Sequence, residues 1–145
     1  MDSIKIRIAN QNDEHIIAEH DDHIQQNVIS DKITRGEIYV AYDGDKFIGW
    51  LRYGMFWDTV PFMNMLMLLP EYRGKGIGRR LVTFWEEEMR KQGHTQLFTS
   101  TQQNEHAQHF YNALGYVAAG GFAQGCGALT EESFEIILIK ELASL

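Results

Sequence analysis

The spacing of hydrophobic residues changes several times along the chain. Residues 4–8 read IKIRI and alternate apolar with charged side chains, which is the period of a half-buried strand. Two helical stretches are predicted next, one around Ile16 and Ile17 after the capping residues Asn10 and Asn12, and one over residues 22–35 before Gly36. Both stretches are rich in His, Asp and Gln, so we expect them at the edge of the fold.

A hairpin and a further strand are predicted next. Residues 37–42 and 46–55 read as strands, and Asp43-Gly44-Asp45 between them is typical of a tight hairpin turn. Residues 61–69 are nearly all apolar, which favours a strand buried on both faces, and Pro70 ends it.

The clearest helix spans residues 77–91 and ends before Gly93. Its apolar residues share one face, and oppositely charged residues pair at four-residue spacing on the other. We then expect a strand over residues 96–101, a helix whose face includes Phe110 and Leu114, and two closing strands over residues 116–119 and 134–140. A glycine-rich segment, residues 120–127, joins the last two strands. This order predicts an α/β (α+β) fold with a mixed, mostly antiparallel sheet and helices on both faces.

Composition narrows the class of protein. The 145 residues fit a single domain over residues 1–145, and the net charge of -7 disfavours a nucleic-acid partner. The N-terminus lacks the apolar stretch of a signal peptide, and no apolar run is long enough to span a membrane, so we expect a cytoplasmic protein without a membrane partner. The single cysteine, Cys126, excludes an internal disulfide and a cysteine-based zinc site, and we expect no metal.

A glycine-rich loop, Arg73-Gly74-Lys75-Gly76-Ile77-Gly78, stands between the predicted strand over residues 61–69 and the clearest helix. Closely spaced glycines let backbone N–H groups approach an anion, and the following helix adds unsatisfied N–H groups and its positive dipole end. The loop therefore predicts a pyrophosphate site. A Walker loop would need Ser or Thr after Gly-Lys, and a dinucleotide fingerprint would need glycine at Leu81, so both alternatives fail.

Two motifs resemble those of the GNAT superfamily of acyl-coenzyme A-dependent acyltransferases, and the resemblance covers nearly the whole chain. They are Arg73-x-x-Gly76-x-Gly78 and the later segment from Asn104 to Tyr116, with Phe110-Tyr111-x-x-Leu114-Gly115-Tyr116. The resemblance implies a GNAT-like sheet of about six to seven strands. It also implies an N-acetyltransferase that moves acetyl from acetyl-coenzyme A to a primary amine of a small molecule or peptide, by direct transfer in a ternary complex. The alternative is a non-catalytic acyl-coenzyme A-binding or sensing module.

The resemblance also implies roles for particular residues. Backbone amides of Arg73, Gly74, Lys75, Gly76, Ile77 and Gly78 would hold the pyrophosphate. Leu66, Met67 and Leu68 would line the pantetheine arm, and an amide of Leu66 or Leu68 would polarise the thioester carbonyl. Asn104 would contact the pantetheine, cap the following helix, or do both. Tyr111 would protonate the departing thiolate, while the alternative is that it packs with Phe110 and Leu114.

The general base and the acceptor are less well defined. Many relatives place a glutamate where Asn64 stands, and an amide cannot act as a base. Asp58 is the leading carboxylate, followed by Glu37 and Glu71, and a water relay is an equal alternative; His94, His106 and His109 are expected at the surface. Trp57 and Asp58, beside Phe56, are predicted to bind the acceptor, or else to cap the core and form a turn. The sequence is compatible with a homodimer through the C-terminal strands and residues 120–127.

Overall fold

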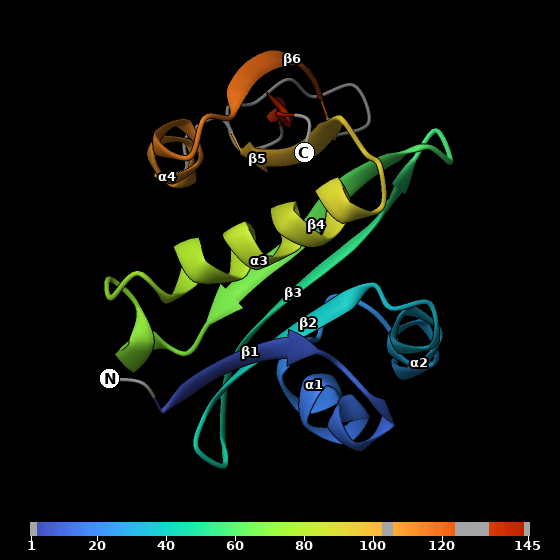
Figure 1. The fold of residues 1–145 in the computed structure, drawn as a ribbon, viewed down its shortest axis with the longest axis vertical. Helices are drawn as coiled ribbons and strands as arrows, with labels where there is room; N and C mark the ends of the chain where they lie inside the picture. Colours follow the sequence, from blue (N-terminus) through green and yellow to red (C-terminus); the bar gives the residue numbers. More distant parts are fainter. Residues whose placement is uncertain (1–2, 103–105, 124–133, 144–145) are drawn as a thin grey trace. The chain divides into compact units, whose positions relative to one another are not determined.

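The structure is a computed structural model that describes residues 3–102, 106–123 and 134–143. The described strands form one seven-stranded sheet in the order β1-β2-β3-β4-β5-β7-β6. Figure 1 shows β2 beside β3 in this sheet. The β4–β5 pair is parallel, and the pairs β1–β2, β2–β3, β5–β7 and β6–β7 are antiparallel. The predicted mixed, mostly antiparallel sheet of six to seven strands is confirmed.

The chain divides into two compact units. Unit 1 comprises the described parts of residues 1–54 and 64–88, and unit 2 comprises those of residues 55–63 and 89–145. The elements that lie in or begin in unit 1 are β1 (Ile4–Ile8), η1 (Gln11–Asp13), α1 (Glu14–His20), α2 (Gln26–Thr34), β2 (Ile38–Asp43), β3 (Lys46–Phe56), η2 (Pro70–Tyr72) and α3 (Ile77–Lys91). The remaining elements are β4 (Val60–Leu68), β5 (Gln96–Gln102), α4 (Ala107–Ala113), β6 (Val117–Ala123) and β7 (Phe134–Glu141). Three elements, β3, β4 and α3, contribute residues to both units.

Helices cover both faces of the strands in unit 1. On one face, Ile17 of α1 and Ile29 of α2 belong to the same buried cluster as Trp50 of β3. On the other face, the ring of Tyr39 lies 5.2 Å from that of Phe84, and the ring of Tyr53 lies 5.8 Å from that of Trp85, both in α3. Side chains of a strand alternate between its faces, so this division follows from the sequence of β2 and β3. The predicted helices on both faces are therefore present.

Several local predictions are confirmed closely. Helix α3 spans Ile77–Lys91, and Gly93 follows it with a φ of 92° and an amide bonded to the carbonyl of Arg90. The predicted hairpin joins β2 and β3, with Gly44 at a φ of 58°. Both features depend on a few neighbouring residues, which is why their positions could be predicted from the sequence.

Helix α2 begins at Gln26, so its predicted start at Asp22 is wrong. The carboxylate of Asp21 accepts a hydrogen bond of 3.2 Å from the amide of His23. That bond uses the amide in a local turn, and the segment between α1 and α2 remains non-helical.

Two strand predictions are also corrected. Strand β4 is not buried on both faces: Pro61 and Met63 are buried, Asn64 is exposed, and residues 65–68 are half-buried. An apolar run shows that a segment lacks charged side chains, but it does not show which faces of the strand are covered.

Strand β6 continues through Gly120 and Gly121 to Ala123, beyond its predicted end at residue 119. A Cβ at Gly121 would lie 2.6 Å from the carbonyl oxygen of Glu135, so glycine permits the close pairing with β7.

The capping residue of α4 in the structure is His106, which makes no side-chain capping bond. Asn104 and Cys126 lie outside the described residues, as does the second half of the glycine-rich segment, residues 124–127. Within the described ranges, none of the helices combines the length and the apolar character needed to cross a bilayer.

Candidate active site

The predicted phosphate loop forms the connection between β4 and α3 in unit 1. Gly74 has a φ of 73° and Gly76 a φ of 82°, a left-handed region that favours glycine. A Cβ at either position would meet no described atom within 4 Å. Immediately afterwards α3 begins at Ile77, which is buried. The loop therefore offers an open, glycine-shaped backbone at the N-terminus of a helix of 15 residues, and this geometry fits a pyrophosphate.

Arg73 ties this loop to the end of β4. Its Nε donates a hydrogen bond of 3.0 Å to the carbonyl of Leu68, and its Nη2 lies 3.5 Å from the sulfur of Met67. The structure thus brings together two predicted groups, residues 66–68 and residues 73–78. Because the guanidinium contacts the protein itself, the Arg73 side chain positions the loop.

Charged and aromatic side chains lie next to the glycine loop. The Nζ of Lys75 and that of Lys46 lie 5.6 Å and 5.4 Å from the ring centre of Tyr72. Lys46 also bonds the carboxylate of Glu71 at 3.0 Å. The backbone amide of Glu71 and the Lys46 ammonium lower the pKa of the Glu71 carboxyl. Glu71, one of the predicted bases, is therefore held as an ion-paired carboxylate.

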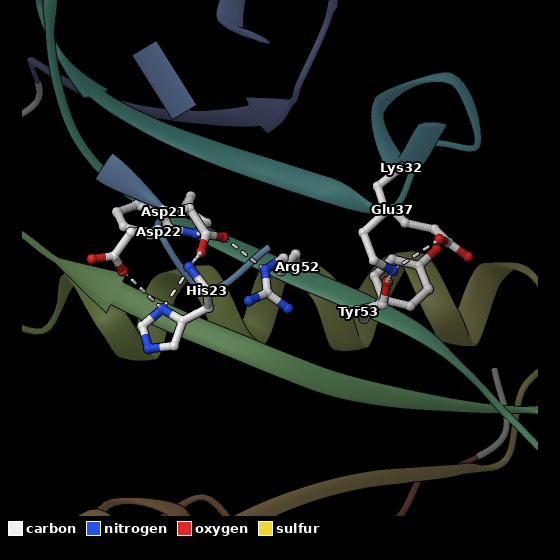
Figure 2. A network of polar contacts seen from close by, with 8 residues as sticks. Asp21, Asp22, His23, Lys32, Glu37, Arg52 and Tyr53 are labelled. Carbon is white, nitrogen blue, oxygen red and sulfur yellow. Dashed lines mark hydrogen bonds and ion pairs between the residues drawn. The ribbon is translucent and has the colours of Figure 1, made fainter. Parts of the chain in front are cut away.

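Glu37 is also held in an ion pair, as Figure 2 shows. Its Oε1 accepts hydrogen bonds of 3.1 Å each from Lys32 and Arg35, and the residue is buried. Because the residue is buried and its carboxylate bonds two cations, the structure disfavours Glu37 as the base. Of the imidazoles, His106 and His109 are exposed as expected, whereas His94 is half-buried.

The predicted acceptor residues lie at the turn between β3 and β4, in unit 2. Trp57 and Asp58 have φ angles of 54° and 62°, and the amide of Thr59 bonds the carbonyl of Phe56 at 3.1 Å. Positive φ at two adjacent non-glycine residues is uncommon and favours this tight turn. It leaves Asp58 exposed and the Trp57 side chain 73% exposed.

An aromatic hollow of about 290 Å³ lies beside that turn. Its lining includes Phe56, Trp57, Phe62 and Phe98, together with Ile137 and Ile139 of β7. The Phe56 and Phe98 rings are 5.6 Å apart, and the Trp57 ring lies 4.6 Å from that of Phe56. Of the two predicted acceptor residues, Trp57 lines this aromatic hollow, whereas Asp58 is not among its lining residues. The sequence did not single out Phe62 and Phe98, because its predictions for their strands concerned the core and the coenzyme.

Tyr111 lies on α4 in unit 2 and is buried. Its ring is edge-on to Phe110 at 5.2 Å and to Tyr116 at 5.8 Å, and its carbonyl accepts a bond from the amide of Tyr116 at 3.0 Å. The predicted helical motif is therefore formed. The predicted donor-binding residues 66–68 and 73–78 belong to unit 1, and Tyr111, Trp57 and Asp58 belong to unit 2.

A buried ion pair that the sequence analysis missed anchors the segment after α1. The Oδ2 of Asp21 accepts a hydrogen bond from Arg52 Nε at 2.7 Å (Figure 2). The same oxygen accepts a second bond from Trp50 Nε1 at 3.1 Å. Burial alone would raise the pKa of Asp21, but Arg52, with the amide of His23 and the indole of Trp50, outweighs it and the pKa is lowered. Asp21 directly precedes the predicted helix over residues 22–35, which we expected at the edge of the fold, and no local pattern indicated its distant partner.

Lys32 was missed for a different reason. It is buried on α2, where it follows the half-buried Val28 by four residues and the buried Ile29 by three. That spacing places Lys32 on the apolar side of its helix, so the signal was present in the sequence.

Within the described ranges, no three His, Cys, Asp or Glu residues form a group that could hold a metal ion.

Comparisons with known proteins agree with this geometry. The Acetyltransferase (GNAT) family matches residues 5–116. N-alpha-acetyltransferase 30 of Schizosaccharomyces pombe is 32% identical over 83 residues, which are 54% of this chain and 55% of that protein. The chain thus spans about half the length of this curated relative.

Two solved structures share the fold at low identity. Ard1 from Thermoplasma volcanium has a TM-score of 0.82 at 14% identity, covering 98% of this chain and 99% of that one. Arabidopsis thaliana Naa50, in complex with the bisubstrate analogue CoA-Ac-MVNAL, has a TM-score of 0.78 at 18% identity, covering 97% and 99%. The family match extends over most of the sequence, and it includes the glycine loop and the Tyr111 helix. The chain therefore belongs to the acetyltransferase (GNAT) family.

Proposed function

We propose that this protein transfers the acetyl group of acetyl-coenzyme A to a primary amine, by direct attack in a ternary complex. The observation that carries the proposal is the open loop at Gly74 and Gly76, at the N-terminus of α3 and tied to β4 through Arg73. Its amides would hold the pyrophosphate of the donor. The relative named as an N-alpha-acetyltransferase and the fold neighbour bound to an acetyl-peptide analogue make peptide N-termini the first acceptor class to test.

Different groups of this chain would bind the donor, stabilise the developing charge and transfer protons. The donor supplies an activated thioester. The backbone of residues 66–68 would line its pantetheine arm, and the amide of Leu66 or Leu68 would donate to the thioester oxygen, where negative charge develops. As the new nitrogen–carbon bond forms and the carbon–sulfur bond breaks, the thiolate would receive a proton from Tyr111, and the attacking amine would lose its proton to Asp58 or to water.

The acceptor would enter beside the aromatic hollow of unit 2. Phe56, Trp57, Phe62 and Phe98 present apolar rings there, which suits an apolar side chain near the attacking amine. Asp58, exposed at the adjoining turn, would attract an ammonium group. The predicted homodimer and the cytoplasmic location stay predictions.

The experiment is release of free thiol from acetyl-coenzyme A with a panel of peptides, amino acids, polyamines and other primary amines. We expect turnover with at least one class. Tyr111→Phe should lower kcat by about a hundredfold or more while binding of the coenzyme is retained. Tyr42→Phe is the matched control, because Tyr42 bonds Asp13 and stands outside both motifs.

The outcomes separate the parts of the proposal. Unchanged kcat in Tyr111→Phe would remove that tyrosine from the mechanism. Coenzyme binding without turnover across the whole panel would favour a non-catalytic acyl-coenzyme A-binding module. Absence of coenzyme binding would contradict the role given to the glycine loop.

A further inference from the structure

His23 is an exposed imidazole beside two carboxylates, in the segment between α1 and α2. Its Nδ1 lies 3.4 Å from Asp22 Oδ1 and 3.6 Å from Asp21 Oδ1, and its side chain is 61% exposed. Figure 2 shows Nδ1 turned toward the carboxylates and the other ring nitrogen, Nε2, turned away from them. No group of the described residues hydrogen-bonds Nε2. This nitrogen therefore faces solvent and can meet a substrate.

The carboxylates beside Nδ1 suit the chemistry of a base. A carboxylate next to one nitrogen of a neutral imidazole favours the proton there, which leaves the other nitrogen as an acceptor. When that nitrogen takes a proton, the ring becomes a cation, and carboxylates at ion-pair distance stabilise it. The charged groups of the described residues that lie here are Asp21 and Asp22, with Arg52 on the other oxygen of Asp21.

Asp21 is held in place by strand β3. Its Oδ2 bonds Arg52 and Trp50, and the residue is buried. Its Oδ1 accepts the amide of His23 at 3.2 Å, so this oxygen is directed toward the residue that carries the imidazole. Trp50 and Arg52 alternate with Tyr53, whose ring packs against α3. The segment with His23 therefore lies on the face of β3 that α3 does not cover.

The donor-binding part of β4 reaches the same face. Met65 and Met67 pack against the buried cluster that contains Trp50, and the indole of Trp50 bonds Asp21. Between the two methionines stands Leu66, whose amide is one of the two that would donate to the thioester oxygen. Helix α3 covers the opposite face of unit 1, so an amine that attacks a thioester at Leu66 would approach from the face that carries His23.

We propose that His23 is the general base of the acetyl transfer and that Asp21 positions it. As the amine nitrogen bonds the acetyl carbon and the carbon–sulfur bond breaks, Nε2 would take the proton that the nitrogen loses, and Tyr111 would protonate the thiolate. The exposed imidazolium would then return its proton to water. His23 belongs to the same unit as the donor-binding residues 66–68 and 73–78, whereas Asp58 belongs to unit 2. This inference rests on the proposed acetyltransferase function.

The test is chemical rescue of His23→Ala, with the best acceptor of the amine panel. We expect the rate of acetylation to fall by about a hundredfold while binding of the coenzyme is retained. Imidazole added to the buffer should then raise the rate of the variant by at least about tenfold, because the free base can replace the missing one at an exposed site. The acetylated acceptor is measured by mass, since imidazole can itself accept acetyl and release thiol.

His15→Ala is the matched control. His15 is also an exposed imidazole beside a carboxylate, with its Nε2 2.9 Å from Glu19 Oε1. We expect the wild-type rate there and no response to imidazole. The substitution at His23 keeps the backbone amide that bonds Asp21, so the urea midpoint of His23→Ala should match that of the wild type. A wild-type rate in His23→Ala, or a lowered rate that imidazole does not raise, would overturn the inference.

A second readout needs no turnover. The imidazole signal of His23 in an NMR spectrum, assigned from its loss in His23→Ala, should shift when the bisubstrate analogue CoA-Ac-MVNAL is added and remain in place with coenzyme A alone. If no amine of the panel is acetylated, the proposed function fails, and this signal then decides whether His23 lies at the amine. A signal that stays in place with millimolar analogue would overturn the inference.

Discussion

Two buried ion pairs, labelled in Figure 2, contact strand β3 in unit 1, and they differ in the number of cations that bond the carboxylate. Asp21, with 1% of its surface exposed, accepts bonds from the amide of His23, the indole of Trp50 and the guanidinium of Arg52. Of these three donors, Arg52 carries the positive charge.

The second carboxylate, Glu37, bonds two cations, Lys32 and Arg35. Burying charges costs free energy, which the protein recovers only through good geometry and further hydrogen bonds. The comparison therefore teaches that Asp21 and Arg52 depend on each other, whereas Glu37 keeps the Arg35 cation when Lys32 is removed.

The largest expected effect on stability comes from breaking the ion pair between Asp21 and Arg52. Asp21→Asn would place an amide among three donors and leave Arg52 buried without a counter-charge. We expect the free energy of unfolding to fall by about 3–5 kcal/mol, measured by urea denaturation. Asp22→Asn is the matched control, because its side chain is 92% exposed, and a change within about 0.5 kcal/mol is expected there. Equal stability of the two variants would contradict the structural role of Asp21.

Breaking the ion pair between Lys32 and Glu37 should lower the free energy of unfolding by less. In Lys32→Met the Arg35 guanidinium still bonds Glu37, and methionine keeps most of the apolar stem. We expect a fall of about 1–3 kcal/mol in the free energy of unfolding, smaller than for Asp21→Asn in the same experiment. The exposed Lys5 provides the control as Lys5→Met. A loss as large as that of Asp21→Asn would show that Arg35 does not compensate for the removal of Lys32.

The smallest effect concerns acid pH. The folded-state pKa of Asp21 is lowered, so its stabilisation is complete above the unfolded value of about 4 and is lost as pH falls through the lower folded value. The difference in unfolding free energy between the wild type and Asp21→Asn should therefore narrow below about pH 4. Denaturation curves at pH 6, 4 and 3 measure this difference, in which groups common to both proteins cancel. A difference that stays constant over this range would contradict the assigned cause.

Elements that depend on neighbouring residues could be predicted from the sequence. The hairpin at Asp43-Gly44-Asp45, helix 77–91 and the glycines of the loop were all located correctly, because turn geometry, helical periodicity and positive φ are properties of a few consecutive residues. The same holds for the helical motif around Tyr111, although its chemical role stays a prediction.

Features that join distant segments could not be predicted in this way. Asp21 and Arg52 are 31 residues apart, and Lys32 and the Tyr53 carbonyl are 21 residues apart. The first contact joins the segment after α1 to β3, and the second joins α2 to the same strand. The aromatic hollow likewise collects side chains from β3, β4, β5 and β7.

The sequence by itself determined the order of the elements, the glycine loop before α3 and the family, because each depends on the spacing of neighbouring residues. Only the tertiary structure decided which polar residues are buried and which distant groups they bond. Burial and hydrogen-bond pairing depend on segments that meet through the sheet, and no short stretch of sequence contains both partners.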